Sequence, residues 1–294
     1  MNFLRAAAAP LLAAAAFLCA WPAQAASYLW EVSSLTNRVY LFGTVHAGKP
    51  SWYPLPHAVD DAFQGSRVLV VEADITDEQA MAKSQASAMY VPPANLKTHV
   101  PAEDYVRFRK LLQRYEIPED QVIRMKPFMA ASMLVFNEWA RQGYTPTYGV
   151  DLYLLTQAKE QHKTIVELEG VDEQIRLMDS FSNDETLRLF HGTLEALESG
   201  LTGEQVHGLV KAWQAGDPEG VLAVARRYND RIAGAAEFED RFIWSRHETM
   251  LKKIRGYLDD TKERHFIAVG ALHLAGPRGL VERLRKMGYI VKQL

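Results

Sequence analysis

The chain has 294 residues with 33 Lys and Arg, 36 Asp and Glu and 9 His, so its formal net charge is −3. Hydrophobic residues make up 48% and charged residues 23%, which is typical of a folded globular protein and excludes a disordered chain, a collagen and a coiled-coil rod. Because no positive excess is available to neutralise phosphates, a nucleic-acid partner is not expected. The single Cys excludes a disulfide framework and a Cys-rich zinc site.

The N-terminus has the layout of a secretory signal peptide. Arg5 precedes a run of apolar residues and Pro over residues 6–21, and Ala23-Gln24-Ala25 is a small-x-small cleavage site. The run is shorter than the roughly 20 apolar residues that a membrane span needs. We therefore predict a signal peptide over residues 1–25 and a periplasmic or secreted protein that has no transmembrane segment after cleavage. Cleavage removes the Cys, which suits an oxidising compartment.

Short apolar strands are predicted near both ends of the chain. In chain order they are Tyr28–Val32, Val39–Phe42, Arg67–Val71, a weaker strand at Thr164–Val166, His265–Val269 and Tyr289–Val291. The first two form a predicted hairpin, and the last two bracket a predicted helix over Pro277–Met287, which makes a βαβ unit. His265, at the start of its strand, is expected to face outward.

The middle of the chain has the apolar spacing of helices. The predicted helices are Asp77–Tyr90, Ala102–Tyr115, Pro127–Gln142, Val150–Gln161, Asn183–Glu198, Thr202–Gln214, Pro218–Tyr228 and Glu237–Leu258. Ser182 and Glu185 form a capping box before one of them. A stripe of Phe128, Met129, Met133 and Phe136 lies at helical spacing, and we predict that it packs in the core.

These elements predict an α/β fold with a central mixed, partly parallel sheet that is built from both chain ends and carries a large, mainly helical insertion. One domain is expected over residues 26–294. Residues 26–76 and 259–294 form its sheet core, and residues 77–258 form the insertion, which also contributes a strand near residues 164–166.

Polar side chains follow three of the predicted strands. His46 ends the motif Gly43-Thr44-Val45-His46, Glu72 follows Val71, and His273 ends the motif Gly270-Ala271-Leu272-His273. Ligands of open α/β sheets bind beyond the carboxyl ends of the strands, so these side chains are expected to converge if the strands are parallel neighbours. Glu167 and Glu169, after the weaker strand, could enter the same crevice, and Asp74 is a weaker candidate.

Two imidazoles and one carboxylate are a common ligand set for a divalent transition metal, which activates a bound water for hydrolysis. A second carboxylate can then act as the general base. A lone His after a strand is more often a structural residue, but two Gly-x-x-His motifs in the same context favour a site. Without a metal, His46 could serve as general base with Glu72 orienting it.

The motifs together resemble the TraB/GumN family. The matching segments are Tyr40–His46, Leu55-Pro56, Val70–Asp74, Gly149–Asp151, Glu167–Glu169 and Phe266–Gly276. This family includes the Tiki metal-dependent proteases and is similar to erythromycin-esterase-like and haem-binding ChaN-like proteins. The resemblance implies a TraB/GumN/Tiki-like fold, and it implies that His46, Glu72 and His273 bind a metal, with manganese or cobalt favoured and zinc as a further option.

The family often carries an Arg-Asn pair before its last βαβ unit, and this chain has Arg246-His247 instead. Arg246 could bind a substrate carboxylate or stabilise an oxyanion, or it could be a charge on the surface of a helix. His247 could be a third imidazole of the site.

The sequence therefore predicts an exported metal-dependent hydrolase, most specifically a peptidase acting on a peptide or protein. Its predicted catalytic residues are Glu72, His46, His273, Glu169 and Arg246, with Glu72 or Glu169 moving the proton. The alternatives are a metal-free hydrolase with a His general base and a non-enzymatic protein that binds haem or a peptide.

Overall fold

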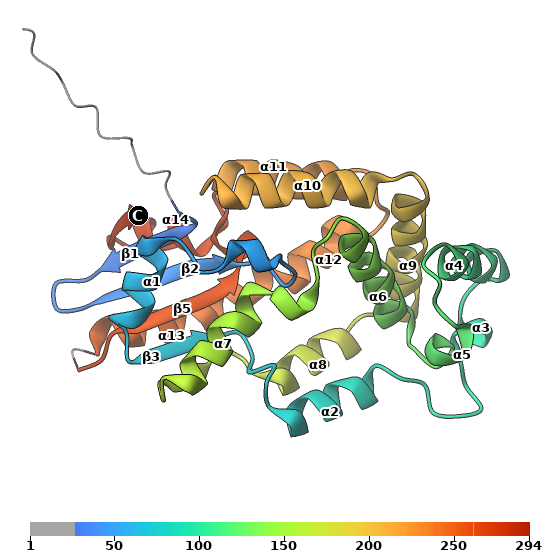
Figure 1. Ribbon diagram of the computed structural model, residues 1–294, viewed down its shortest axis with the longest axis horizontal. Coiled ribbons are helices and arrows are strands. Elements are labelled where there is room, and N and C mark those ends of the chain that lie inside the picture. Colours follow the sequence, from blue (N-terminus) through green and yellow to red (C-terminus); the bar gives the residue numbers. More distant parts are fainter. Residues whose placement is uncertain (1–26, 261) are drawn as a thin grey trace, which may run out of the picture.

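A mixed sheet lies at the centre of the computed structural model, which describes residues 27–260 and 262–294 (Figure 1). In the described part of the chain the sheet has six strands in the order β4-β3-β5-β2-β1-β6. Their bounds are β1 Leu29–Ser33, β2 Arg38–Thr44, β3 Val68–Val71, β4 Thr164–Glu167, β5 His265–Gly270 and β6 Ile290–Gln293. The predicted signal peptide, residues 1–25, lies outside the described residues.

The predicted fold class is confirmed. Strands β2, β5, β3 and β4 run parallel, whereas β1 lies antiparallel between β2 and β6. β1, β2 and β3 come from one end of the chain, β5 and β6 from the other, and β4 from the helical region between them. The apolar runs of β2, β3 and β5 are buried on both faces, as expected for inner parallel strands.

The predicted βαβ unit spans the sheet instead of joining neighbouring strands. β5 and β6 are connected by α14, Leu280–Lys286, but β2 and β1 lie between them. β6 pairs with β1, so the last strand closes the edge that the N-terminal hairpin would otherwise expose. The predicted helix is therefore present, and it begins three residues later than expected.

Helices cover both faces of the sheet and form a further layer beyond its edge. The remaining helices are α1 His57–Gln64, α2 Glu78–Ser87, α3 Leu96–His99, α4 Ala102–Arg114, α5 Glu119–Val122, α6 Pro127–Arg141, α7 Val150–Glu160, α8 Val171–Asp179, α9 Asn183–Glu198, α10 Leu201–Gln214, α11 Pro218–Asn229, α12 Ala235–Phe242 and α13 His247–Asp259. Short 3-10 turns are η1 Pro50–Trp52, η2 Pro146–Tyr148, η3 Trp244–Arg246 and η4 Ala271–Leu274. None of the described helices is long and apolar enough to cross a membrane.

The two largest apolar cores of the described residues hold these layers together. In Figure 1, α1 and α7 lie in front of the sheet and α13 lies behind it, and their apolar side chains share the main core with Leu41 and Phe266 of the strands. The second core joins α4, α6 and α9 around Phe108, Leu134 and Phe190. Because the second core has no strand, the helical region beyond the sheet is stabilised by its own apolar packing.

Two sequence predictions on the last third of the chain are wrong. The predicted helix Glu237–Leu258 is interrupted at Ile243, whose φ of −113° and ψ of −66° depart from helical values, and it continues through η3 into α13. His265 is buried instead of facing outward, and its ring stacks on Tyr257 with centroids 4.4 Å apart. Both errors concern packing against the sheet, which helical or strand periodicity does not specify.

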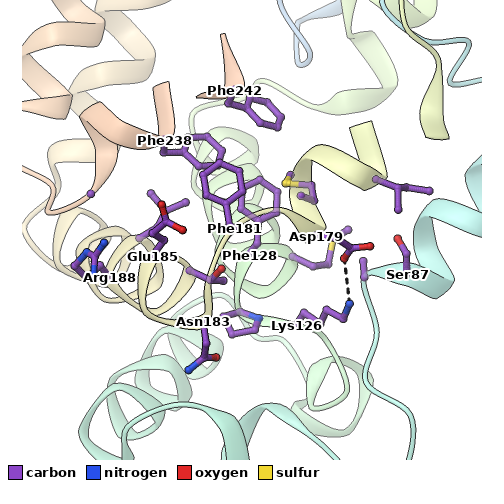
Figure 2. Close-up of a pocket in the computed structure, with 18 of the residues that line it drawn as sticks. Ser87, Lys126, Phe128, Asp179, Phe181, Asn183, Glu185, Arg188, Phe238 and Phe242 are labelled. Carbon is purple, nitrogen blue, oxygen red and sulfur yellow. Dashed lines mark ion pairs between the residues drawn. The ribbon is translucent and has the colours of Figure 1, made fainter. Parts of the chain in front are cut away.

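The stripe on α6 is only partly a core element. Met133 packs against the second core, and Phe136 packs against a smaller cluster around Ala47. Phe128 and Met129 instead line a cavity, where Phe128 lies among other phenylalanines (Figure 2). The fully buried side of α6 instead carries Ala130, Ala131 and Leu134, so the stripe did not mark it, and the spacing could not indicate that the facing helices leave a space beside Phe128 and Met129.

Candidate functional site

The parallel strands bring the predicted site residues to one edge of the sheet. Thr44 of β2 lies opposite Gly270 of β5, and Val71 of β3 lies opposite Ala268 of β5. Consequently His46, His273, Glu72 and Glu169 all follow strand ends at the same edge. This is the edge at which open α/β sheets bind ligands.

Arg246 joins two glutamates below the sheet edge. Its Nη2 donates to Glu72 Oε2 at 2.6 Å and also to Glu169 Oε2, and its Nε donates to Glu169 Oε1 at 2.9 Å. The side chains of Arg246 and Glu169 are 6% and 4% exposed, whereas Glu72 is 16% exposed. The interruption after α12 places Arg246 in this cluster, so it is not a surface charge.

All five N–H groups of Arg246 point at acceptors. Besides the glutamates, Nη1 donates to the Phe242 carbonyl at 2.9 Å and to His273 Nε2 at 3.3 Å. Arg246 therefore has no free donor for a substrate carboxylate or an oxyanion in this arrangement. Its effect is to hold the two carboxylates in place.

The charges of the cluster depend on one another. Burial alone would raise the pKa of Glu72, but the charge of Arg246 and the Gly270 amide, which donates to Glu72 Oε1 at 2.7 Å, lower that pKa below its ordinary value. Burial would also lower the pKa of Arg246, but its bonds to Glu169 and the charge of Glu72 raise it. Glu72 and Arg246 therefore stay ionised at neutral pH.

A chain of imidazoles sets the orientation of His273. His247 Nδ1 lies 2.9 Å from the Arg278 carbonyl, so it must donate, and His247 Nε2 is left as an acceptor. His273 Nδ1 lies 2.9 Å from that acceptor and therefore donates to it. Burial lowers the pKa of His247 to about 3, which keeps this imidazole neutral. His273 Nε2 is consequently the acceptor that faces Arg246 Nη1, 3.3 Å away.

His46 lies apart from this cluster and faces solvent. Its side chain is 65% exposed, and its Nδ1 lies 2.8 Å from Asp151 Oδ2, while Thr44 Oγ1 donates to Asp151 Oδ1. The Asp151 carboxylate raises the pKa of His46 to about 9. Sequence reasoning assigned the orienting role to Glu72, but the partner is Asp151. His46 and Asp151 are 105 residues apart, and the only sequence feature that singled out Asp151 was the Gly149–Asp151 motif.

The residues present do not form a metal site in this arrangement. Within residues 27–260 and 262–294, no group of three or more His, Cys, Asp and Glu side chains is placed to hold a metal ion. His46 is turned to Asp151, and the Arg246 guanidinium occupies the space between Glu72 and Glu169 that a cation would need. The predicted set of His46, Glu72 and His273 is therefore only partly brought together.

The weaker candidates have structural roles. Asp74 Oδ1 accepts from the Thr76 amide at 2.9 Å, and Glu167 Oε1 accepts from the Asp74 amide at 2.7 Å, so both stabilise the turn after β3. Gly43 lies within β2 and gives space to the Tyr28 ring, which a Cβ at Gly43 would meet at 2.3 Å. Gly170, directly after Glu169, has a φ of +90° that favours glycine.

Comparisons with known proteins agree on one family. The model of the TraB/PrgY/gumN family matches residues 28–293. The uncharacterized protein YbaP of Escherichia coli is 24% identical over 88% of this chain and 93% of its own length. Two relatives named metalloproteases, TIKI1 of Danio rerio and the TIKI homolog of Nematostella vectensis, are 23% and 22% identical over 90% of this chain. The alignments span 63% and 66% of those two proteins. No solved structure matches the chain significantly.

Proposed function

The chain belongs to the TraB/PrgY/gumN family, and from this membership and the geometry of the site we propose that it is an exported hydrolase, most specifically a peptidase. The observation that carries the proposal is the pair of His46 and Asp151, in which the His46 side chain faces solvent at the same sheet edge as the buried Arg246 cluster. Relatives named metalloproteases support the hydrolase class. The N-terminal segment supports export to the periplasm or beyond.

His46 is the proposed general base. Its Nδ1 donates to Asp151, so Nε2 is left to take a proton from a water molecule that attacks the substrate carbonyl. Only the neutral imidazole can do this, and Asp151 raises the pKa of His46 to about 9. The rate of water attack should therefore rise with pH until about pH 9.

The buried cluster is proposed to bind and orient the peptide. Glu72 is the more exposed of the two glutamates, so its carboxylate is the one placed to accept a hydrogen bond from a substrate amide. Arg246 and Glu169 hold Glu72 in position, and His247 holds His273 through its Nδ1. Preorganised polar groups of this kind lower the cost of orienting a substrate.

The names of the TIKI relatives favour a second candidate, a metal-dependent peptidase. In that case His46, Glu72 and His273 would hold manganese or cobalt, or alternatively zinc, and the metal would supply an activated water. These residues do not fit a metal in the arrangement described above, so no catalytic step is assigned to one.

The test is hydrolysis of a peptide mixture, followed by mass spectrometry, with chelator-treated protein and with added manganese, cobalt or zinc. Metal-free hydrolysis that is lost in His46→Ala and Asp151→Asn but kept in His207→Ala, an exposed control on α10, is the expected result. Hydrolysis only after metal is added would support the second candidate. Peptide release without cleavage, or a Soret band, would indicate a binding protein and contradict both.

A further inference from the structure

A cavity of about 440 Å³ lies in the helical region beyond the sheet (Figure 2). Its walls come from α2, α6, α8, α9, α12 and the short segments next to them. Four phenylalanines share one side of it, namely Phe128, Phe181, Phe238 and Phe242. Cavities of roughly 300–1,000 Å³ with an aromatic lining and a few polar groups are typical of ligand sites.

The four phenylalanines are arranged as a platform. The rings of Phe238 and Phe242 stack with centroids 4.8 Å apart, and Phe238 also stacks on Phe181 at 5.2 Å and on Phe128 at 5.5 Å. All four remain partly exposed, unlike the core residues Phe108 and Phe190, which are fully buried. The four partly exposed rings leave apolar surface in contact with water. An apolar ligand that covered them would gain the free energy of burying that surface.

The platform is connected directly to the candidate active site. Phe242 lines the cavity, while its carbonyl accepts from Arg246 Nη1 at 2.9 Å and its ring lies 5.6 Å below the Arg246 guanidinium. On the opposite wall, α8 begins at Val171, two residues after Glu169. The helices that form the cavity therefore also hold the two ends of the buried ion pair.

The lining of the cavity also includes polar groups of both charges. Lys126 and Asp179 form an ion pair of 3.6 Å, and Figure 2 shows Ser87 on the same side as this pair and Glu185 and Arg188 on the opposite side, next to Phe238. A peptide has neutral amides that both donate and accept hydrogen bonds, so it suits a mixed rim. A fatty acid would need a cationic rim for its carboxylate.

We propose that this cavity is the specificity subsite of the enzyme and takes an aromatic or large aliphatic side chain of the peptide substrate. The inference rests on the proposed peptidase function. The substrate side chain packs on the four phenylalanines, next to the Phe242 carbonyl that binds Arg246. Burying a phenylalanine side chain favours binding by about 10- to 100-fold over alanine.

Binding can be measured without turnover by using the His46→Ala variant. The probes are fluorescein-labelled peptides of the form Gly₃-X-Gly₃, with X as Phe, Leu, Ala or Asp, and the readout is the dissociation constant from fluorescence anisotropy. We expect Phe and Leu peptides to bind at least tenfold more tightly than Ala and Asp peptides. Ser87→Trp fills the cavity from α2 and should remove this difference, while Gln85→Trp, which is exposed on the same helix and does not line the cavity, should keep it.

Phe238→Ser provides a second test if Ser87→Trp does not fold, because it removes the central ring of the platform. Equal binding of the Phe and Ala peptides, absence of binding, or selectivity that persists in both variants would overturn the assignment. Competition by dodecanoate but not by peptides would assign the cavity to an acyl chain and overturn it as well. Selective binding in a protein that cleaves no peptide would reject the proposed hydrolase while retaining the subsite.

Discussion

Removing the Arg246 charge should destabilise the fold, because it leaves two buried carboxylates without their cation. Arg246→Met keeps most of the side-chain volume. Glu72 and Glu169 both bond to the same nitrogen of Arg246, so their oxygen atoms lie within about 5 Å of each other. At that separation two negative charges repel by about 3 kcal/mol at an effective dielectric constant of 20. Breaking a buried ion pair costs about 3–5 kcal/mol in other proteins, which agrees with this value.

The assay is urea unfolding followed by circular dichroism at pH 7. We expect Arg246→Met to lose about 3–5 kcal/mol of unfolding free energy, which for a domain of this size lowers the melting temperature by roughly 6–20 °C. Arg246→Met/Glu169→Gln should recover part of the loss, since one carboxylate is gone. Arg255→Met, on the exposed side of α13, is the matched control and should change stability by less than about 0.5 kcal/mol.

The loss should also shrink at pH 5. Without Arg246, repulsion raises the pKa of one of the two glutamates, so this carboxyl binds a proton as the pH falls and the repulsion disappears. A loss below about 1 kcal/mol, or a double-mutant cycle with a coupling energy near zero, would refute the reasoning, because it would mean that the two glutamates are not held by Arg246.

Three further predictions follow from the histidines. Asp151→Asn should lower the pKa of His46 from about 9 toward its ordinary value of 6.5, and an NMR titration that leaves it unchanged would contradict the pairing. His247→Phe removes the acceptor for His273 Nδ1, so His273 should no longer be held in one tautomer and its imidazole ¹⁵N shifts should change. Hydrolysis should fall by about 10- to 100-fold. Unchanged ¹⁵N shifts would show that His247 does not orient His273. Burial lowers the pKa of His265, so the unfolded chain binds more protons below pH 6.5 and stability falls as the pH drops through that value. His265→Phe keeps the stacking on Tyr257 and should lessen this loss between pH 7 and pH 5 in urea unfolding; an equal loss in both proteins would exclude His265 as a cause.

Much of the local structure could be predicted from the sequence. Apolar runs located the strands of the sheet, and helical periodicity located most of the helices, because both signals lie within a few neighbouring residues. The position of His46, Glu72 and His273 after parallel strands also predicted their common edge. Helix and strand boundaries, and the break at Ile243, depend on contacts with distant elements and were not predicted.

The sequence by itself determined which polar residues stand at the ends of the strands, since the alternation of apolar and polar residues is local. Only the tertiary structure decided how they pair. Asp151 reaches His46 from a helix 105 residues away, and the interruption before α13 brings Arg246 between two glutamates. The same is true of the cavity, because the spacing on α6 specifies an apolar face but not the helices that meet it. Pairing and empty space arise from long-range packing, and no short stretch of sequence contains that information.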